Sequence, residues 1–140
     1  IIVRIQERGS FSSGSAELNP EFLDVMNLIG DAVVKSPGRV VVAGHTDDVP
    51  ISTKRFRSNW ELSSARAVTV VHALLQNPEI EPQRVPVEGH ADSNPQVAND
   101  SRENRAVNRR VELILERGED LDNGENLPIE KPADKAEGAQ

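Results

Sequence analysis

Two acids and one arginine are spaced so that they could bind a ligand that carries both charges. Asp47 and Asp48 follow an apolar run at residues 40–43, and Arg66 lies two turns into the helix predicted next. In a shared cleft, a carboxylate would bind an ammonium group and the guanidinium would bind a carboxylate through two hydrogen bonds. The same residues could instead form a structural salt bridge between loop and helix, and spacing alone leaves both hypotheses open.

Two histidines offer a different chemistry, that of a metal-dependent hydrolase. Residues 42–47 and 87–92 form a faint internal repeat, and each segment runs from a predicted strand into a polar loop. If the two loops converge, four side chains could hold a metal: His45, Asp47, His90 and Asp92. Their spacing matches no established metal motif, so we expect no metal, no cofactor and two histidines that tie down their own loops by hydrogen bonds.

Other residues that often do chemistry have ordinary interpretations. The small-residue run at residues 9–15 lacks the Gly-x-Ser-x-Gly pattern of a nucleophile, so we expect no catalytic residue there. His72 lies mid-helix without an evident partner. Trp60 is either a packing residue at a helix start or part of the rim of the ligand cleft. A basic cluster is either a solvated loop or a contact for an acidic partner: Lys54, Arg55 and Arg57.

The elements that position these residues follow from periodicity. Strands are predicted at residues 1–7, 40–43, 84–88 and 111–115, where apolar residues alternate or run continuously. Helical spacing connects Phe22, Met26, Ile29 and Val33 after an expected cap at Asn19, and Asp100 or Ser101 is expected to cap a short third helix. The order is β-α-β-α-β-(α)-β. Two amphipathic helices on one face of a four-stranded mixed sheet make an α+β, two-layer sandwich.

The helix that carries Arg66 has the clearest local signals. Ser58 and Glu61 have the spacing of a capping box, and Pro78 ends the helix near Asn77. Its predicted apolar face consists of Leu62, Ala65, Val68, Val71 and Leu75.

Two further local expectations concern glycine and proline. Pro86 within the third predicted strand favours an edge position. Gly44 and Gly89, which open the two repeated loops, are expected to supply a backbone conformation that other residues rarely adopt.

Composition limits the function. The chain has 140 residues, no cysteine and 3% aromatic residues, which suits one modest domain at 1–117 and a tail at 118–140. The net charge is −7, of which the seven acids and two lysines of the tail account for −5, leaving −2 for the domain. We therefore expect no binding of nucleic acid and an acidic, disordered tail. The chain begins at Ile1 with no visible membrane segment, so we expect an anchor upstream of it.

Several motifs occur in an order that resembles the OmpA-like peptidoglycan-binding domain. They are Gly44–Asp47, Asn59–Ala67, Gly89–Asp92 and Asn104–Val111, within a match from about Phe11 to Glu116. In detail the sequence is most similar to the C-terminal periplasmic domain of flagellar motor stator B subunits, the MotB/PomB type. That likeness lies in residues 11–18, 45–51 and 58–63.

The resemblance implies a non-enzymatic clamp on the diaminopimelate of the peptidoglycan stem peptide. Asp47 matches the family acid that holds the amine, and Arg66 matches the arginine that holds a carboxylate. Asn59, Leu62 and Arg109 match other pocket positions. Ser12 replaces an aspartate of the outer-membrane branch, and the loop at residues 48–57 is longer than in that branch.

The resemblance also implies a biological setting. The domain would lie in the periplasm and work as a homodimer. It would join a stator A subunit through an inner-membrane helix upstream and anchor an ion-driven flagellar stator to the wall. An outer-membrane protein or lipoprotein that uses the same domain to hold peptidoglycan is the alternative.

Overall fold

The computed structural model describes residues 1–116. Both the predicted boundary at residue 117 and the predicted disordered tail at 118–140 lie outside the described residues and stay predictions. Within the described part, no helix is long and apolar enough to cross a membrane.

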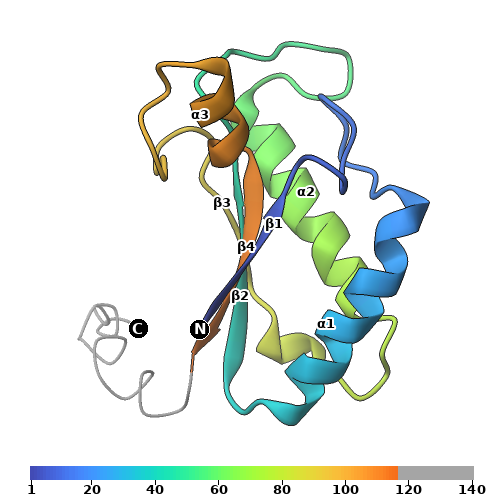
Figure 1. Cartoon of the computed structure of the whole chain (residues 1–140). Helices are drawn as coiled ribbons and strands as arrows, with labels where there is room; N and C mark the ends of the chain where they lie inside the picture. The colour runs from blue at the N-terminus through green and yellow to red at the C-terminus, as the bar shows by residue number, and fades with distance from the viewer. Residues whose placement is uncertain (117–140) are drawn as a thin grey trace, which may run out of the picture.

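The fold is a two-layer α+β sandwich, as the sequence predicts (Figure 1). Four strands form one mixed sheet in the order β1-β4-β2-β3. The strands are β1 (Ile2–Gln6), β2 (Arg39–His45), β3 (Val87–Gly89) and β4 (Arg110–Glu116). The helices are α1 (Leu23–Lys35), α2 (Asn59–Leu74) and the short α3 (Arg102–Asn108), with 3-10 turns at Pro20–Phe22 and Pro82–Arg84.

Strand direction brings several chain segments to one end of the sheet. β4 runs antiparallel to both β1 and β2, while β2 and β3 are parallel. The carboxyl ends of β1, β2 and β3 therefore meet the start of β4. In the strand register, Arg110 lies opposite Gln6 of β1 and opposite His45 of β2. Glu7 and Asp47, which follow these two residues, therefore both lie just beyond the first residue of β4.

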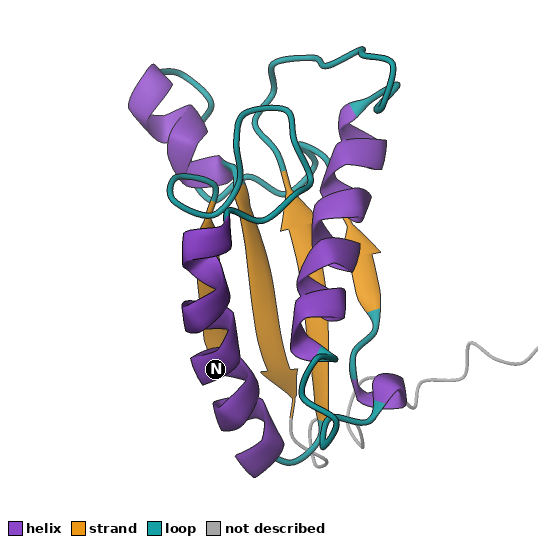
Figure 2. Cartoon of the chain, turned by 90° about the vertical axis from the view of Figure 1, so that its right-hand side faces the viewer, coloured by secondary structure: helices purple, strands orange, loops and turns teal. Residues whose placement is uncertain are grey.

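The core lies between the sheet and the two long helices, which cover the same face (Figure 2). Met26 and Val33 of α1 are buried on the predicted face. The predicted face of α2 is partly wrong: Val68 is 39% exposed, whereas Ala67 and Val70 are fully buried. The buried face of α2 also contains polar residues, including Ser63 and Arg66, which a search for apolar periodicity passes over.

Helix α2 packs against the sheet so closely that only glycine fits beneath it. A Cβ at Gly44 would overlap the backbone carbonyl of Ser63, and one at Gly89 would overlap the side chain of Ser64. Neither glycine has a positive φ, so the expected special backbone conformation is wrong. Within the two repeated loops, a positive φ occurs at Ala91 instead, at 52°. The two glycines therefore fix the distance between α2 and the ends of β2 and β3.

The predicted caps differ in outcome. Ser101 caps α3 by accepting from the Asn104 backbone N–H at 3.0 Å, as predicted. The capping box of α2 does not form, because Glu61 accepts from the backbone N–H of Arg57 at 2.7 Å and pairs with its guanidinium. Asn19 likewise makes no side-chain cap.

Two boundaries shift from their predicted positions. Helix α2 ends at Leu74, because a turn in which Asn77 N–H donates to the Leu74 carbonyl follows it. Strand β3 is shorter than predicted, since Pro82–Arg84 form a 3-10 turn, but it lies at a sheet edge as expected.

Replacing Gly44 by alanine tests this close packing. We expect Gly44→Ala to lower the free energy of unfolding by about 3 kcal/mol, because the new methyl group forces α2 away from the sheet. The matched control is Gly30→Ala in α1, where the added Cβ would have its nearest neighbour, a methyl of Ile80, at 3.8 Å. The control should stabilise by about 0.5–1 kcal/mol through helix propensity. Urea unfolding of both variants measures the difference; equal effects would contradict the packing argument.

Candidate functional site

All five residues that the sequence assigns to the ligand site line one cavity of about 320 Å³: Asp47, Asn59, Leu62, Arg66 and Arg109. The cavity lies at the end of the sheet where β1 and β2 end and β4 begins. Glu7 and the loop residues Val49, Pro50 and Ile51 complete much of its wall, so the long loop after Asp47 is part of the cavity.

Helix α2 supplies three of these residues from one face. Asn59, Leu62 and Arg66 are spaced by three and four positions, which aligns them along a helix. Asn59 Nδ2 donates to the carbonyl of Val49 at 3.0 Å and so holds the loop against the helix. Leu62 is buried in a small apolar cluster with Phe56.

Arg66 is held by the loop that follows β1. Its side chain is 3% exposed, and its Nε and Nη2 donate to the carbonyls of Ser15 at 2.7 Å and Ser12 at 3.0 Å. Nη2 also pairs with Glu7 Oε2 at 2.9 Å. Burial lowers the pKa of Arg66, and the charge of Glu7 opposes that shift. The direct salt bridge between Asp47 and Arg66 is therefore not formed, and Arg66 makes its structural ion pair with Glu7 instead.

Glu7 and Arg109 connect the two residues that the sequence singled out. Arg109 Nε pairs with Glu7 Oε1 at 2.8 Å, and Arg109 Nη1 pairs with Asp47 Oδ2 at 2.7 Å. The result is a chain of ion pairs in the order Arg66–Glu7–Arg109–Asp47, with two charges of each sign. Burial acts to lower the pKa of Arg109, but hydrogen bonds to Asp47 and Glu7 raise it overall. The cavity wall is therefore electrically neutral yet strongly dipolar, which suits a zwitterion.

Glu7 is the residue of this cluster that sequence reasoning missed. It follows an alternating strand that gives no local sign of a binding site. The available signal was its position directly after β1, but that signal becomes informative only when β1 is known to run parallel to β2.

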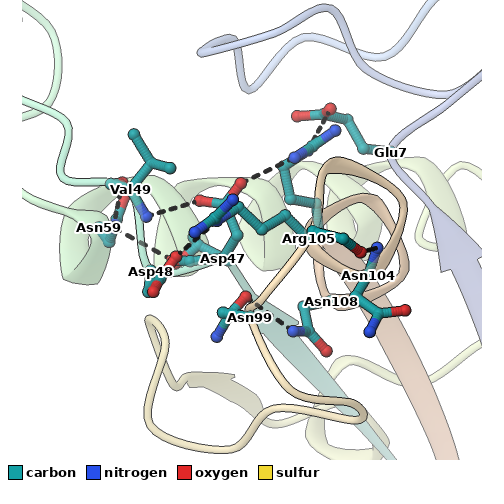
Figure 3. A network of polar contacts seen from close by, with 12 residues as sticks. Glu7, Asp47, Asp48, Val49, Asn59, Asn99, Asn104, Arg105 and Asn108 are labelled. Atoms are coloured by element: carbon teal, nitrogen blue, oxygen red, sulfur yellow. Dashed lines mark hydrogen bonds and ion pairs between the residues drawn. The ribbon is translucent and has the colours of Figure 1, made fainter.

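Further polar contacts connect α3 to the loops next to it (Figure 3). Arg105 of α3 pairs with Asp48 at 2.9 Å. Asn108 is fully buried, and its side chain bonds to the backbone of Gln96 and Val97 and to the Asn99 side chain at 2.8 Å. These contacts fix the start of β4 and, with it, Arg109.

The two repeated loops converge, but not around a metal. The rings of His45 and His90 stack with centroids 4.7 Å apart. Asp47 points instead to Arg109, and within residues 1–116 no group of three or more potential ligands could hold a metal ion. The metal-hydrolase alternative therefore has no structural support. His90 makes a local hydrogen bond to Glu88 at 2.8 Å, as expected, whereas both buried ring nitrogens of His45 lack a hydrogen-bond partner.

The environment of His45 favours its neutral form. Burial lowers its pKa to about 4, and the positive charge of Arg110 acts in the same direction, while Glu112 opposes both. His90 lowers the pKa slightly and Glu88 raises it.

His45 therefore makes stability depend on pH. Between its ordinary pKa of 6.5 and its folded pKa of about 4, the unfolded chain binds a proton at His45 that the folded chain does not. The free energy of unfolding accordingly falls as the pH falls through this window. We expect His45→Leu to reduce that loss, so that thermal melts show a Tm advantage that grows from pH 6.5 to pH 4. His72→Leu, at an exposed helix position, should track the wild type; parallel profiles for all three proteins would refute the assignment.

The remaining sequence candidates lie at the surface. Trp60 is 55% exposed and so lies outside the core. Lys54, Arg55 and Arg57 are exposed, as a solvated loop requires, and Arg57 pairs with Glu61.

Comparison with known proteins identifies the family. The model of the OmpA family matches residues 10–109 of this chain, which include every site residue except Glu7. The chain belongs to the OmpA family. Motility protein B of Bacillus subtilis is 36% identical to this OmpA-family domain over 120 residues, covering 84% of this chain and 46% of that protein. The chain thus spans about half the length of the curated relatives it matches.

Solved structures agree with this assignment. A MotB-like protein from Desulfovibrio vulgaris is 37% identical with a TM-score of 0.77, covering 83% of this chain and 74% of that one. The cell wall anchor of the T6SS from Pseudomonas aeruginosa is 41% identical with a TM-score of 0.75, covering 82% and 81%. The OmpA-like, MotB-like resemblance read from the sequence is thereby confirmed.

Proposed function

We propose that this domain binds peptidoglycan without catalysis, by gripping the diaminopimelate of a stem peptide. The observation that carries the proposal is the neutral chain of two acids and two arginines along one wall of the cavity. The free end of diaminopimelate carries an ammonium group and a carboxylate on one carbon. Such a compact zwitterion suits a cavity of about 320 Å³ whose wall offers both charges side by side.

Each site residue has a proposed role. Asp47 accepts hydrogen bonds from the ligand ammonium group, and Arg66 and Arg109 face the ligand carboxylate. Asn59 holds the loop over the ligand, and Leu62 gives the cavity an apolar floor. Glu7 supplies a second carboxylate, in a domain where Ser12 replaces the aspartate of the outer-membrane branch.

The biological setting follows from the likeness to Motility protein B. We propose that the domain lies in the periplasm, dimerises, and anchors a flagellar stator to the wall. The link to a stator A subunit would run through an inner-membrane helix upstream of Ile1.

A second candidate is wall anchoring for a different envelope assembly. The likeness to the cell wall anchor of the T6SS, at 41% identity, favours it. An outer-membrane protein or lipoprotein is a further variant, since the protein named Probable lipoprotein YiaD of Escherichia coli is 32% identical over 82% of this chain. The sequence upstream of Ile1 separates these settings: a single membrane helix containing an acid indicates a stator, and a lipid-attachment motif or barrel does not.

Asp47 provides the cleanest test of the site. We expect Asp47→Asn to weaken co-sedimentation with diaminopimelate-containing sacculi by about tenfold or more, because a charge-assisted hydrogen bond to the ligand amine is lost. Asp31→Asn, a like change on exposed α1, is the control and should bind as the wild type does. Full binding by a well-folded Asp47→Asn protein would sink the proposed site. Arg66→Ala is a poorer test than the sequence suggests, because the buried guanidinium also holds the Ser12–Ser15 loop.

Glu7 gives an independent test, because the sequence alone did not predict it. Glu7→Gln keeps the shape of the side chain but leaves the cavity wall with one net positive charge. We expect the affinity for the zwitterionic stem peptide to fall about tenfold. The matched control is Glu17→Gln, where the carboxylate is 77% exposed and its nearest cation, Arg55, is 3.8 Å away. Isothermal titration with a diaminopimelate tripeptide measures both; equal affinities for the two variants would rule out a direct role for Glu7.

A further inference from the structure

A groove of about 820 Å³ lies between the end of β1 and helix α3. It shares Glu7 and Arg109 with the ligand cavity, so the groove and the cavity have part of one wall in common. An occupant of the groove would therefore lie next to the ion-pair chain of the site.

The walls of this groove combine apolar surface with positive charge. Ala106 and Val107 of α3 are half-buried and give the groove an apolar side. Three arginines and two acids line it, and one of those acids, Glu7, already pairs with two arginines. Arg8 and Arg102 are exposed, and neither forms an ion pair within the part of the chain that the structure describes. The groove therefore suits a peptide that carries apolar side chains next to acids.

The sequence after β4 contains a segment with this complementary pattern. Residues 125–130 read Glu-Asn-Leu-Pro-Ile-Glu, so two large apolar side chains stand between two acids. The proline favours an extended backbone for the residue before it, which suits binding along a groove. Apart from Leu121, the apolar residues of this segment are the only large ones in residues 118–140: Leu127 and Ile129.

The length of the chain allows this segment to return to α3. Strand β4 has seven residues, so Glu116 lies about 20 Å from the end of β4 that follows α3. Glu125 comes nine residues after Glu116, and nine extended residues span about 30 Å. Residues 125–130 can therefore reach the groove. Glu119 and Asp120 cannot, because four extended residues span only about 13 Å.

We propose that residues 125–130 bind in this groove of their own chain. The two glutamates pair with Arg8 and Arg102, and the two large apolar side chains pack on α3. Because groove and segment belong to one molecule, the effective concentration of the segment is high, and contacts that are weak between separate molecules are enough to hold it.

The shared residue Arg109 connects this contact to the ligand cavity. In the proposed function, on which this step rests, Arg109 faces the carboxylate of the ligand. Two of its nitrogens already bond to Glu7 and Asp47. An acid bound beside Arg109 from the groove competes with the ligand for the remaining donors, so the bound segment lowers the affinity for the stem peptide.

Nuclear magnetic resonance of the full chain tests the contact itself. We expect the change Glu125→Gln/Glu130→Gln, the tail variant, to shift the backbone amide resonances of the residues that line the groove. The matched control is Glu119→Gln/Asp120→Asn, which removes the same charge where the chain is too short to reach, and it should leave these resonances as in the wild type. Unshifted groove resonances in the tail variant, or equal shifts in both proteins, would overturn the proposal.

A second copy of the chain could offer the same segment, and dilution separates the two cases. Binding within one molecule predicts that the difference between wild type and tail variant stays the same on about tenfold dilution of the protein. A difference that disappears on dilution would refute binding within one chain.

The groove side is tested with a synthetic peptide of residues 118–140. We expect the peptide to shift the groove resonances of the full-length tail variant. The effect should be lost when Arg8→Gln/Arg102→Gln, the groove change, is added to that variant. Lys35→Gln, which removes an exposed cation at the end of α1, is the control and should keep the effect. Equal peptide binding with and without the two arginines would place the contact elsewhere.

Isothermal titration with a diaminopimelate tripeptide tests the competition. We expect the tail variant and the groove change, each in the full chain, to bind the tripeptide about threefold more tightly than the wild type, because more of the protein is then open to the ligand. Unchanged affinity would refute the competition. If no protein binds the tripeptide, the proposed function fails, whereas the amide resonances still decide whether the segment occupies the groove.

Discussion

The ion-pair chain Arg66–Glu7–Arg109–Asp47 is the interaction on which the rest of the site depends. Each member comes from a different part of the sequence: the end of β1, the end of β2, the middle of α2 and the start of β4. Arg66 is almost completely buried, so removing its anionic partner would leave an uncompensated charge at a cost of about 3–5 kcal/mol. The four charges therefore hold each other in place and hold the four elements together.

Sheet topology makes this arrangement possible. β1, β2 and β3 all end at the same edge, so acids that follow two of these strands meet there without any long-range sequence signal. The glycines at 44 and 89 then let α2 approach the sheet closely enough for Arg66 to reach Glu7. Two interactions thus constrain α2: its close packing against the sheet at the two glycines, and the ion pair between Arg66 and Glu7.

The same helix also holds the loop that closes the cavity. Arg66 and Leu62 line the cavity, and Asn59, one turn earlier than Leu62, donates to the carbonyl of Val49 in the loop at 3.0 Å. Residues three and four positions apart lie on one face of a helix, so a single rigid element positions all three side chains.

The sequence by itself determined the elements, their order and the fold class, and its resemblance to a known family singled out five of the residues that line the cavity. It could do so because strand alternation, helix spacing and the ordered motifs are local properties of the chain. The buried face of α2, the role of Gly44 and the partners of Arg66 were misread. Each depends on what helix α2 packs against in the folded chain. A buried arginine or a close contact between helix and sheet leaves no periodic pattern in the sequence. Only the tertiary structure could assign Glu7 to the cavity. Its carboxylate pairs with Arg66 and Arg109, which lie far from it in the sequence, and these pairs form because β1 and β2 end at the same end of the sheet.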